Sequence, residues 1–361
     1  LRMVEQLKES EIRHIPHVLY HWRVFEESTA MNIESKPYAI EAGKNAIQGH
    51  LDRRGDNAIA IEGKWHGSFR VIYGLEKEPL VSVIIPTCDQ LAFLSTCVTS
   101  LLEDTAYDNL EIIIVNNNSK EKNTFAYLDL LKDNPRIRVL DFEGEFNFSA
   151  INNFAVKQCR GELLCFLNND IEVIDSGWLR EMVSHAIRPD VGVVGARLFY
   201  PQQILQHAGI IAGVCGVAGH AFRGGDRNFM GHHGRAYLIQ QYSAVTGACM
   251  VTPKDLFLSL GGFNEENLGV AYNDVDYCFK SRASGRKVIW TPYTELLHHE
   301  SISRGYEDTD EKKERLSKEQ DYMFENWGDI IAWDPAYNPN LTLEKEDFDF
   351  AFPSRAPKFW K

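Results

Sequence analysis

The sequence has no excess of positive charge. Its 361 residues include 38 lysines and arginines against 51 aspartates and glutamates, which gives a formal net charge of -13. Proteins that bind along a nucleic-acid backbone neutralise its phosphates with clustered Lys and Arg, and an acidic chain disfavours such binding. We therefore expect no nucleic acid among the partners.

Paired cysteines are also missing. The seven cysteines are odd in number and scattered, with no CxxC pair, so neither a disulfide framework nor a zinc cluster is indicated. This usage is typical of a reducing compartment. We expect a cytoplasmic location, with peripheral attachment to the inner face of the membrane as an alternative.

No uninterrupted apolar run is long enough to span a membrane. The most apolar stretch, Ile204 to Phe222, contains Gln206, His207, His220 and several glycines, which are poor residues for a spanning helix. The chain begins with Leu1 and shows no signal-peptide pattern, so we expect it to be a piece of a longer protein. At 44% hydrophobic and 25% charged residues, its composition is that of a globular protein.

The pattern along the chain predicts three parts: an N-terminal extension (1–78), an α/β domain (79–305), and a C-terminal helix and tail that pack on it (306–361). In the extension we predict two strands and one helix by residue pattern. They are Ile15–Tyr20, Ser68–Tyr73 and the helix Pro37–Arg53.

The α/β domain is indicated by three apolar runs, Val81–Ile85, Glu111–Val115 and Leu163–Leu167, each followed by polar residues. We predict a Rossmann-like, mostly parallel sheet flanked by helices, in which the carboxyl ends of the strands face one crevice. Further predictions are helices at Leu91–Leu102, Trp178–Ile187, Tyr277–Ser284 and Glu311–Asn326, strands at Val191–Ala196 and Lys287–Trp290, and a loop or lid without periodicity at Gly209–Gly234.

Asp170 is the first candidate for chemistry. A carboxylate at the end of a buried strand can hold a hard divalent cation against a diphosphate, and the neighbouring Asn168 and Asn169 offer amide oxygens. The alternative is a turn cluster that only satisfies its own backbone.

Two further clusters follow. Asp274 and Asp276 precede the predicted helix at Tyr277, so one of them could cap the helix while the other acts as a general base. His298 and His299 are adjacent histidines beside a glutamate, which favours contact with a metal or phosphate over a purely structural role.

Taken in order, these motifs resemble the family 2 glycosyltransferases with the GT-A fold, in particular the rhamnosyltransferase-like branch of O-antigen and capsule assembly. The resemblance covers Val81 to Gly305. Its motifs are Pro86-Thr87, Asn116-Asn117-Asn118-Ser119, Phe146 to Asn153, Asn168-Asn169-Asp170 as a variant of the DxD motif, Thr246-Gly247-Ala248, Gly261-Gly262-Phe263, Asn273 to Asp276, and His298 to Ser301.

The resemblance implies a role for each matching position. Asp170 would bind the metal, Mn²⁺ or Mg²⁺, with His298 preferred over His299 as second ligand, and Asp274 would be the catalytic base. Acceptor contacts would come from Gly247, Gly262, Tyr272 and Asp276, with Trp178 as a rival of Tyr272 for stacking on a sugar ring. Donor contacts would come from Thr87, Asp89, Asn116, Asn117, Asn153, Asn168 and Asn169.

Two departures from the family pattern remove charge, because Asn116 and Asn168 stand where many relatives carry an acid. Fewer carboxylates weaken metal affinity, so we expect the cation to bind together with the donor. The stretch His14 to Arg23 resembles the tail of a preceding transferase domain, and an extension packed on the catalytic domain is an equally plain interpretation.

The resemblance implies an inverting transferase that moves a sugar from a nucleotide diphosphate sugar to a saccharide or a lipid-linked oligosaccharide. The branch favours dTDP-L-rhamnose, with a UDP-hexose or UDP-HexNAc as alternative, and other transferase domains of the same polypeptide are possible partners. A degenerate domain that serves as a scaffold is the rival hypothesis. A nucleotidyltransferase is disfavoured because Thr87 to Leu91 contains neither a glycine-rich loop nor a basic residue.

Overall fold

The protein is described by a computed structural model that covers residues 1–21, 38–299 and 309–358. It divides into two compact units, which we call the smaller and the larger unit. The smaller unit comprises Leu1–Glu76, Asn338–Thr342 and Asp349–Lys361, and the larger unit comprises Lys77–Tyr337 and Leu343–Phe348.

The smaller unit packs the helix α1 (Tyr38–Arg54) against an antiparallel pair of strands, β1 (Ala58–Glu62) and β2 (Phe69–Tyr73). Two short 3₁₀ turns, Val4–Gln6 and Glu9–Glu11, precede them. Its small core consists of Leu51, Ala58 and Ala60, with Ile47, Val71 and Tyr73 packed against them.

The predicted helix and the predicted strand Ser68–Tyr73 are confirmed, although Pro37 lies outside the described residues. The strand β1 was not predicted. The prediction of a strand at Ile15–Tyr20 is wrong, because four of its apolar side chains are exposed and Pro16 has no backbone N–H to donate.

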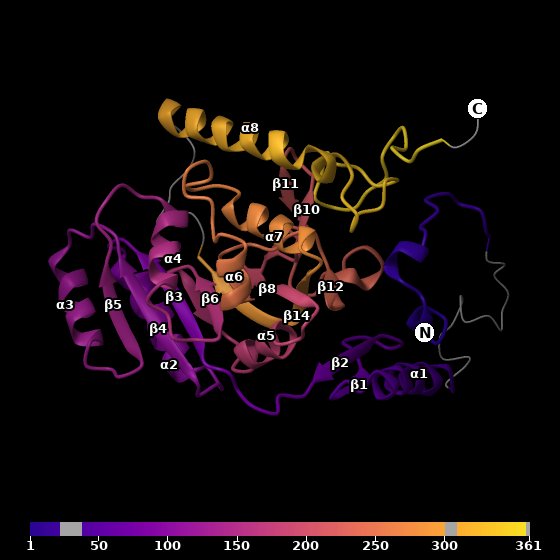
Figure 1. Ribbon diagram of the computed structural model, residues 1–361, viewed down its shortest axis with the longest axis horizontal. Helices are drawn as coiled ribbons and strands as arrows, with labels where there is room; N and C mark the ends of the chain where they lie inside the picture. Colours follow the sequence, from indigo (N-terminus) through magenta and orange to yellow (C-terminus); the bar gives the residue numbers. More distant parts are fainter. Residues whose placement is uncertain (22–37, 300–308, 359–361) are drawn as a thin grey trace. The chain divides into compact units, whose positions relative to one another are not determined.

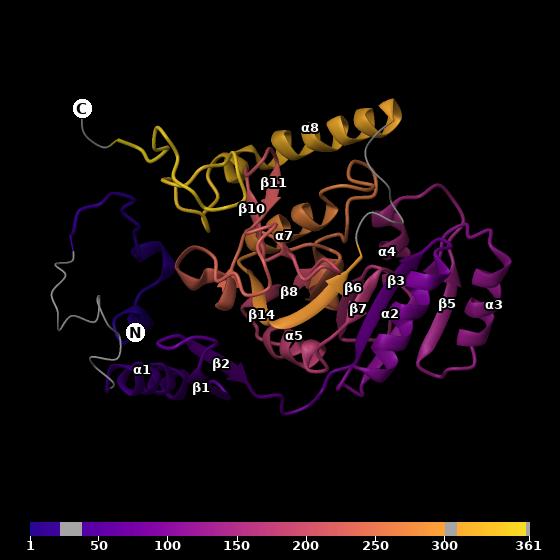
Figure 2. The ribbon, with the colours of Figure 1, turned by 180° about the vertical axis from the view of Figure 1, so that it is seen from behind.

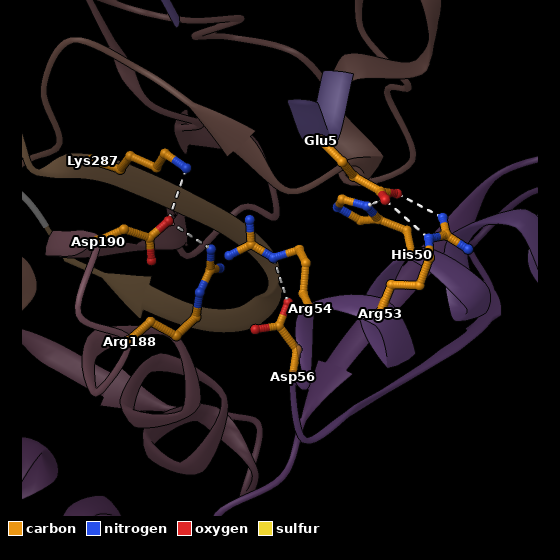
Figure 3. Close-up of polar contacts among 8 residues, drawn as sticks. All are labelled: Glu5, His50, Arg53, Arg54, Asp56, Arg188, Asp190 and Lys287. Atoms are coloured by element: carbon orange, nitrogen blue, oxygen red, sulfur yellow. Dashed lines mark hydrogen bonds and ion pairs between the residues drawn. The ribbon is translucent and has the colours of Figure 1, made fainter. Parts of the chain in front are cut away.

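Ion pairs reinforce the smaller unit, as Figure 3 shows. Glu5 accepts hydrogen bonds from Arg53 Nε at 2.9 Å and Nη2 at 2.6 Å, and its Oε1 lies 2.7 Å from His50 Nδ1. The hydrogen bonds from Arg53 and then His50 lower the pKa of Glu5 to about 2. Arg54 pairs with Asp56 at 2.9 Å. The contacts of Glu5 attach the N-terminal turn to α1.

The larger unit begins with alternating strands and helices. Its first half contains β3 (Val81–Thr87), α2 (Leu91–Glu103), β4 (Leu110–Asn116), α3 (Lys122–Leu131), β5 (Ile137–Asp141), α4 (Phe148–Val156), β6 (Leu163–Leu167), β7 (Ile171–Val173) and α5 (Trp178–Ala186). Its second half contains β8 (Val191–Phe199), β9 (Leu205–His207), β10 (Ile210–Ala212), β11 (Ala218–His220), the 3₁₀ segment His232–Tyr237, β12 (Gln240–Gln241), β13 (Cys249–Pro253), α6 (Lys254–Ser259), α7 (Asn273–Ala283), β14 (Lys287–His298) and α8 (Asp310–Ala332).

A single large sheet organises this unit, with the strand order β12-β14-β8-β13-β6-β3-β4-β5. The strands β6, β3, β4 and β5 run parallel, β8 and β14 are parallel to each other, and β13 is antiparallel to both of its neighbours. The predicted α/β class with a mostly parallel sheet is confirmed. Every residue of β4, β6 and β8 is buried, which explains their continuous apolar runs.

Helices cover the sheet, and Figures 1 and 2 show it from opposite sides. Helix α4 contacts β3 and β4, α3 contacts β5, and α5 contacts β8 and β14. At the start of β14, Lys287 Nζ pairs with Asp190 at 2.8 Å and Arg188 reaches the same carboxylate at 3.2 Å (Figure 3). This pairing fixes the start of β14 beside that of β8.

Several predicted boundaries are wrong in ways that matter for the site. Helix α7 begins at Asn273 instead of Tyr277, and β14 continues beyond Trp290 to His298. The glycine-rich stretch predicted as an irregular loop contains the hairpin β10–β11, and the apolar run from Ile204 contributes β9 as well. Among the helices within the described ranges, none has the length and apolarity needed to cross a membrane.

Candidate active site

A cavity of about 980 Å³ opens at the carboxyl ends of β3 and β6. Its wall includes the segment that follows β3, the start of α4, the start of α7 and the first turns of α8. The strand ends thus converge as the parallel topology predicts. Ten of the predicted site residues line it: Thr87, Asp89, Asn117, Asn168, Asn169, Asp170, Gly247, Tyr272, Asp274 and His298.

Asp170 and His298 form a buried pair in this wall. Oδ1 of Asp170 lies 3.1 Å from Nε2 of His298, yet this oxygen has no well-aligned hydrogen bond. Burial alone would raise the pKa of Asp170, but the contact with His298 more than offsets it and holds that pKa below its ordinary value. The carboxylate is therefore charged at neutral pH.

Gln206 orients His298. Its Oε1 lies 2.6 Å from Nδ1 of His298 and must accept a proton there, while the amide nitrogen of Asn168 lies 3.3 Å from Nε2. The contact with Gln206 therefore makes Nε2, the atom that faces Asp170, the ring nitrogen that can present a lone pair to a cation. An oxygen that accepts the other ring N–H orients a metal-binding histidine in this way.

The pair fits a divalent cation. Adjacent ligands bonded to one cation at about 2.1 Å are roughly 3 Å apart, close to the observed separation of Oδ1 of Asp170 and Nε2 of His298. Among the residues that the structure describes, no cluster of three or more His, Cys, Asp or Glu could hold a metal. The protein thus offers two ligands here, and a ligand would have to complete the coordination.

Asp274 occupies the first turn of α7. Its Oδ2 accepts a hydrogen bond from the backbone N–H of Gly247 at 2.7 Å. A Cβ at Gly247 would lie only 3.3 Å from Cβ of Asp274, so glycine allows this close approach. Tyr272 precedes the helix with φ of 59°, a left-handed conformation that is uncommon for a bulky residue and is often found at functional sites.

Hydrogen bonds on the β3 side hold residues that were predicted to bind the donor. Thr87 Oγ1 accepts a hydrogen bond from Asn169 Nδ2 at 3.1 Å, and Nδ2 of Asn117 donates to the carbonyl oxygens of Phe142 and Gly144, each at 3.2 Å. These contacts hold the strand ends in place beside the cavity.

Asp89 lines the cavity, but its carboxylate also organises the backbone. It accepts the N–H groups of Lys120 at 2.9 Å and Glu121 at 2.9 Å, while its own N–H donates to Ser119 Oγ at 2.8 Å. This ties the β3–α2 segment to the β4–α3 segment.

Five predicted residues do not line the cavity. Two of them are buried and make hydrogen bonds within the protein. Asn116 is buried and donates to Asp141 at 2.8 Å, and Asp276 is fully buried and bonded to Trp327 Nε1 at 2.9 Å and Lys280 at 2.7 Å. Asp276 thereby attaches α7 to α8.

The other three are Asn153, Gly262 and His299. Asn153 donates to the carbonyl oxygen of Phe263 at 2.8 Å, and a Cβ at Gly262 would approach Oδ1 of Asn153 to 2.7 Å, so they pack on each other. His299 Nε2 lies 2.9 Å from Glu172 on β7, and His299 is absent from the cavity wall. Of the two adjacent histidines, only His298 therefore faces the cavity.

Several polar residues of the cavity wall were not predicted as site residues, and five of them lie in β9, in or just after β11, or in α8. Their signals were weak: two interrupt an apolar run, one follows it and two belong to a charged helix. They are Gln206, His220, Arg223, Lys312 and Arg315. Helix α8 is brought to the cavity by Glu319, whose Oε1 accepts the N–H groups of Val270 and Ala271.

Comparisons with known proteins agree with this geometry. Residues 82–238 match the model of the family "Glycosyl transferase family 2". The chain is 46% identical over 355 residues to the uncharacterized protein y4gI of Sinorhizobium fredii, an alignment that covers 98% of this chain and 39% of that protein. It is 40% identical over 344 residues to the O-antigen biosynthesis protein RfbC of Myxococcus xanthus, covering 94% of this chain and 26% of RfbC.

Two solved structures share the fold. The mannosyltransferase PcManGT of Pyrobaculum calidifontis, in complex with GDP-Man and Mn²⁺, has a TM-score of 0.51 at 17% identity and covers 70% of this chain and 66% of its own. GalNAc-T7 with UDP, GalNAc and Mn²⁺ has a TM-score of 0.55 at 13% identity and covers 82% of this chain and 66% of its own.

The chain therefore contains a family 2 glycosyltransferase domain, and the predicted GT-A fold is confirmed. It spans less than half the length of the two similar relatives.

Proposed function

We propose that this chain transfers a sugar from a nucleotide diphosphate donor to a saccharide hydroxyl, with inversion at the anomeric carbon. One observation carries the proposal: the carboxylate of Asp274 and the pair formed by Asp170 and His298 line the same cavity of a family 2 domain. A general base and an anchor for a diphosphate are the two elements that such a displacement requires.

Asp274 is the proposed base. It would remove the proton of the acceptor hydroxyl as the oxygen attacks the anomeric carbon, and a single displacement of this kind inverts the configuration. The N–H of Gly247 holds Oδ2 of Asp274 at 2.7 Å and the N–H of Val275 holds Oδ1 at 2.8 Å, so the orientation of the carboxylate is fixed. Gly247 and Tyr272 would form part of the acceptor side, because both line the cavity next to Asp274.

The diphosphate end of the donor would lie near Asp170 and His298. These two residues would hold Mn²⁺ or Mg²⁺, which when bound offsets the negative charge on the leaving diphosphate. Arg223, Lys312 and Arg315 line the same cavity and add positive charge in a chain that is acidic as a whole. Their side chains would attract the donor and hold its phosphates.

For the donor sugar we retain dTDP-L-rhamnose first and a UDP-hexose or UDP-HexNAc second. The relative RfbC is an O-antigen biosynthesis protein, which supports an acceptor in O-antigen assembly. A lipid-linked acceptor at the inner face of the membrane is part of the proposal. Because the chain spans less than half of each relative, further transferase domains in the same polypeptide are part of the proposal.

The substitution Asp274→Asn tests the base. Loss of a well-placed base lowers turnover by about 10²- to 10⁴-fold, and the variant should still bind donor because Asp274 is not part of the proposed metal pair. The matched control is Asp255→Asn, an exposed aspartate in the first turn of α6. Near-normal turnover of the Asp274 variant would remove Asp274 from this role.

Nucleotide binding separates the enzyme from the scaffold hypothesis. Thermal unfolding is measured with UDP, dTDP and GDP, each with and without Mn²⁺, because a ligand of the folded state raises its stability. We expect a rise in the unfolding temperature that requires both nucleotide and metal. Turnover is then measured with a panel of donors on a lipid-linked acceptor. No rise with any nucleotide would favour a scaffold, and product from a UDP-hexose alone would overturn the preference for rhamnose.

A further inference from the structure

Two histidines outside the proposed metal pair meet at the cavity. His207, on β9, is fully buried, and its Nδ1 lies 3.0 Å from Nδ1 of His220 at the end of β11. The rings are nearly perpendicular, with centroids 5.0 Å apart. His220 lines the cavity and His207 does not, so the pair leads from the interior to the site.

The backbone determines which nitrogen of each ring carries the proton. The N–H of Thr246 points at Nε2 of His207 at 3.4 Å, so this nitrogen must accept. Neutral His207 then carries its proton on Nδ1 and donates it to Nδ1 of His220. His220 in turn carries its own proton on Nε2. The three groups form a directed chain of hydrogen bonds that ends at a ring of the cavity wall.

Two alternatives conflict with the same contacts. A metal bound between the two Nδ1 atoms would need the proton of His207 on Nε2, where it would face the amide proton of Thr246. A charged His207 has the same conflict. Burial, followed by the neighbouring His220 and His298, also holds the pKa of His207 well below its ordinary value.

The chain is anchored on both sides. Thr246 and Gly247 are consecutive, and their amides donate to His207 and to Asp274, respectively, so one short segment orients both the proposed base and the histidine pair. On the other side, the backbone N–H of His220 donates to Glu346 Oε1 at 2.7 Å. The ring of His220 is thus held at a fixed place in the wall.

We propose that His220 binds substrate through its Nε2–H, donating a hydrogen bond to a sugar hydroxyl in the cavity, and that His207 is a positioning residue that fixes this tautomer. The inference rests on the proposed glycosyl transfer. The hydroxyl can belong to the sugar of the donor or to the acceptor. Neutral histidine suits this task because it presents one donor without adding a charge.

The tautomers are measured directly by NMR of the full chain labelled with ¹⁵N-histidine, with the His207 and His220 signals assigned by their loss in the variants. We expect the Nδ1–H form for His207 and the Nε2–H form for His220 at neutral pH. In His207→Gln the signal of His220 should shift toward a mixture of tautomers. An Nδ1–H form of His220, or an unchanged tautomer of His220 in the His207 variant, overturns the proposed chain of hydrogen bonds.

Kinetics test the contact with substrate. His220→Phe removes the donor and should lower kcat/KM about tenfold, the effect of one lost hydrogen bond. His220→Gln places an amide N–H near the position of Nε2 and should recover most of that loss. A raised KM for the nucleotide sugar alone assigns the hydroxyl to the donor, and a raised KM for the acceptor alone assigns it to the acceptor.

The control is His66→Gln, an exposed histidine of the smaller unit that should leave all constants unchanged. Unchanged kinetics in His220→Phe, or equal losses in the Phe and Gln variants, overturns the substrate contact. If the unaltered chain transfers no sugar from any donor, the proposed function fails. The tautomers measured by NMR still test the chain of hydrogen bonds from Thr246 through His207 to His220. The two failures are therefore distinguishable.

Discussion

Glu111 and Asp170 are two buried acids with opposite surroundings, the first on a strand of the large sheet and the second just beyond the end of a strand. Glu111, near the start of β4, accepts four hydrogen bonds: Ser82 Oγ at 2.6 Å, the Arg160 N–H at 2.6 Å, Arg160 Nε at 2.8 Å and Arg138 Nη2 at 3.2 Å. Asp170, beyond the end of β6, has His298 at 3.1 Å, and its Oδ1 lacks a well-aligned hydrogen bond.

The nature of the partner explains the difference. Arginine does not lose its charge in a protein, so Glu111 has fixed counter-ions and a complete set of donors. Histidine can be neutral and can bind a cation through its lone pair. A fully bonded acid stabilises the fold, whereas an incompletely bonded acid beside a histidine is suited to receive a ligand.

The largest effect should come from Asp170→Asn. Loss of the proposed metal ligand is expected to lower kcat/KM by about 10³-fold, since metal assistance is worth several kcal/mol. The Mn²⁺-dependent rise in stability with nucleotide should also disappear. Glu172→Gln, on the adjacent strand β7, is the matched control and should retain both properties. Full activity of the Asp170 variant would break the comparison.

Glu111→Gln should act on stability alone. Replacing this acid removes charged hydrogen bonds from Arg138 and Arg160, and we expect the free energy of unfolding to fall by about 2 kcal/mol. The value is moderate because both arginine side chains reach solvent. Urea unfolding measures the loss, and kcat of the folded fraction should be unchanged. A lower kcat at full stability would contradict the structural role of Glu111.

His299→Gln should have a smaller effect than either. His299 pairs with Glu172 at 2.9 Å with both side chains partly exposed, and such pairs contribute less than about 1 kcal/mol. The variant should keep its Mn²⁺-dependent nucleotide binding, whereas His298→Gln should lose it. Equal losses in the two variants would show that the histidines share the metal.

The smallest expected effect is a difference in the pH dependence of stability between the unaltered chain and Glu111→Gln. Burial would raise the pKa of Glu111, but hydrogen bonds from Ser82 and Arg160 hold that pKa below its ordinary value. An acid with a lowered folded-state pKa stabilises the fold above its unfolded pKa, and this stability is lost as the pH falls toward the folded value. Between pH 7 and pH 3 the free energy of unfolding should therefore fall less steeply in Glu111→Gln than in the unaltered chain. Parallel curves would contradict this cause.

The sheet could be predicted because its strands are buried on both faces, so β3, β4 and β6 appear as continuous apolar runs that end in polar residues. The place of Asp170 followed from that pattern. The hairpin β10–β11 could not be predicted, because each strand has only three residues, too few to show a periodicity, and strand pairing uses backbone groups that every residue carries.

Helix phase explains why Asp274 and Asp276 could not be separated. Successive helical residues are rotated by about 100°, so two acids spaced by two positions point in nearly opposite directions. Only one of the two acids can therefore face the cavity. The argument requires that both belong to α7, and the structure shows that this helix begins at Asn273. The cavity residues Lys312 and Arg315 were missed because tertiary packing of α8, through contacts such as Glu319 with Val270, brings them there.

The segment Leu343–Phe348 has a consequence for how the site is made. Cys215 donates its backbone N–H to Leu343, Phe222 donates to the carbonyl oxygen of Glu346, and Glu346 holds His220 across 126 positions of sequence. A nascent chain on the ribosome therefore exposes the hairpin β10–β11 long before this segment is synthesised. The wall of the cavity that contains His220 is completed only when the last part of the larger unit has emerged and folded back.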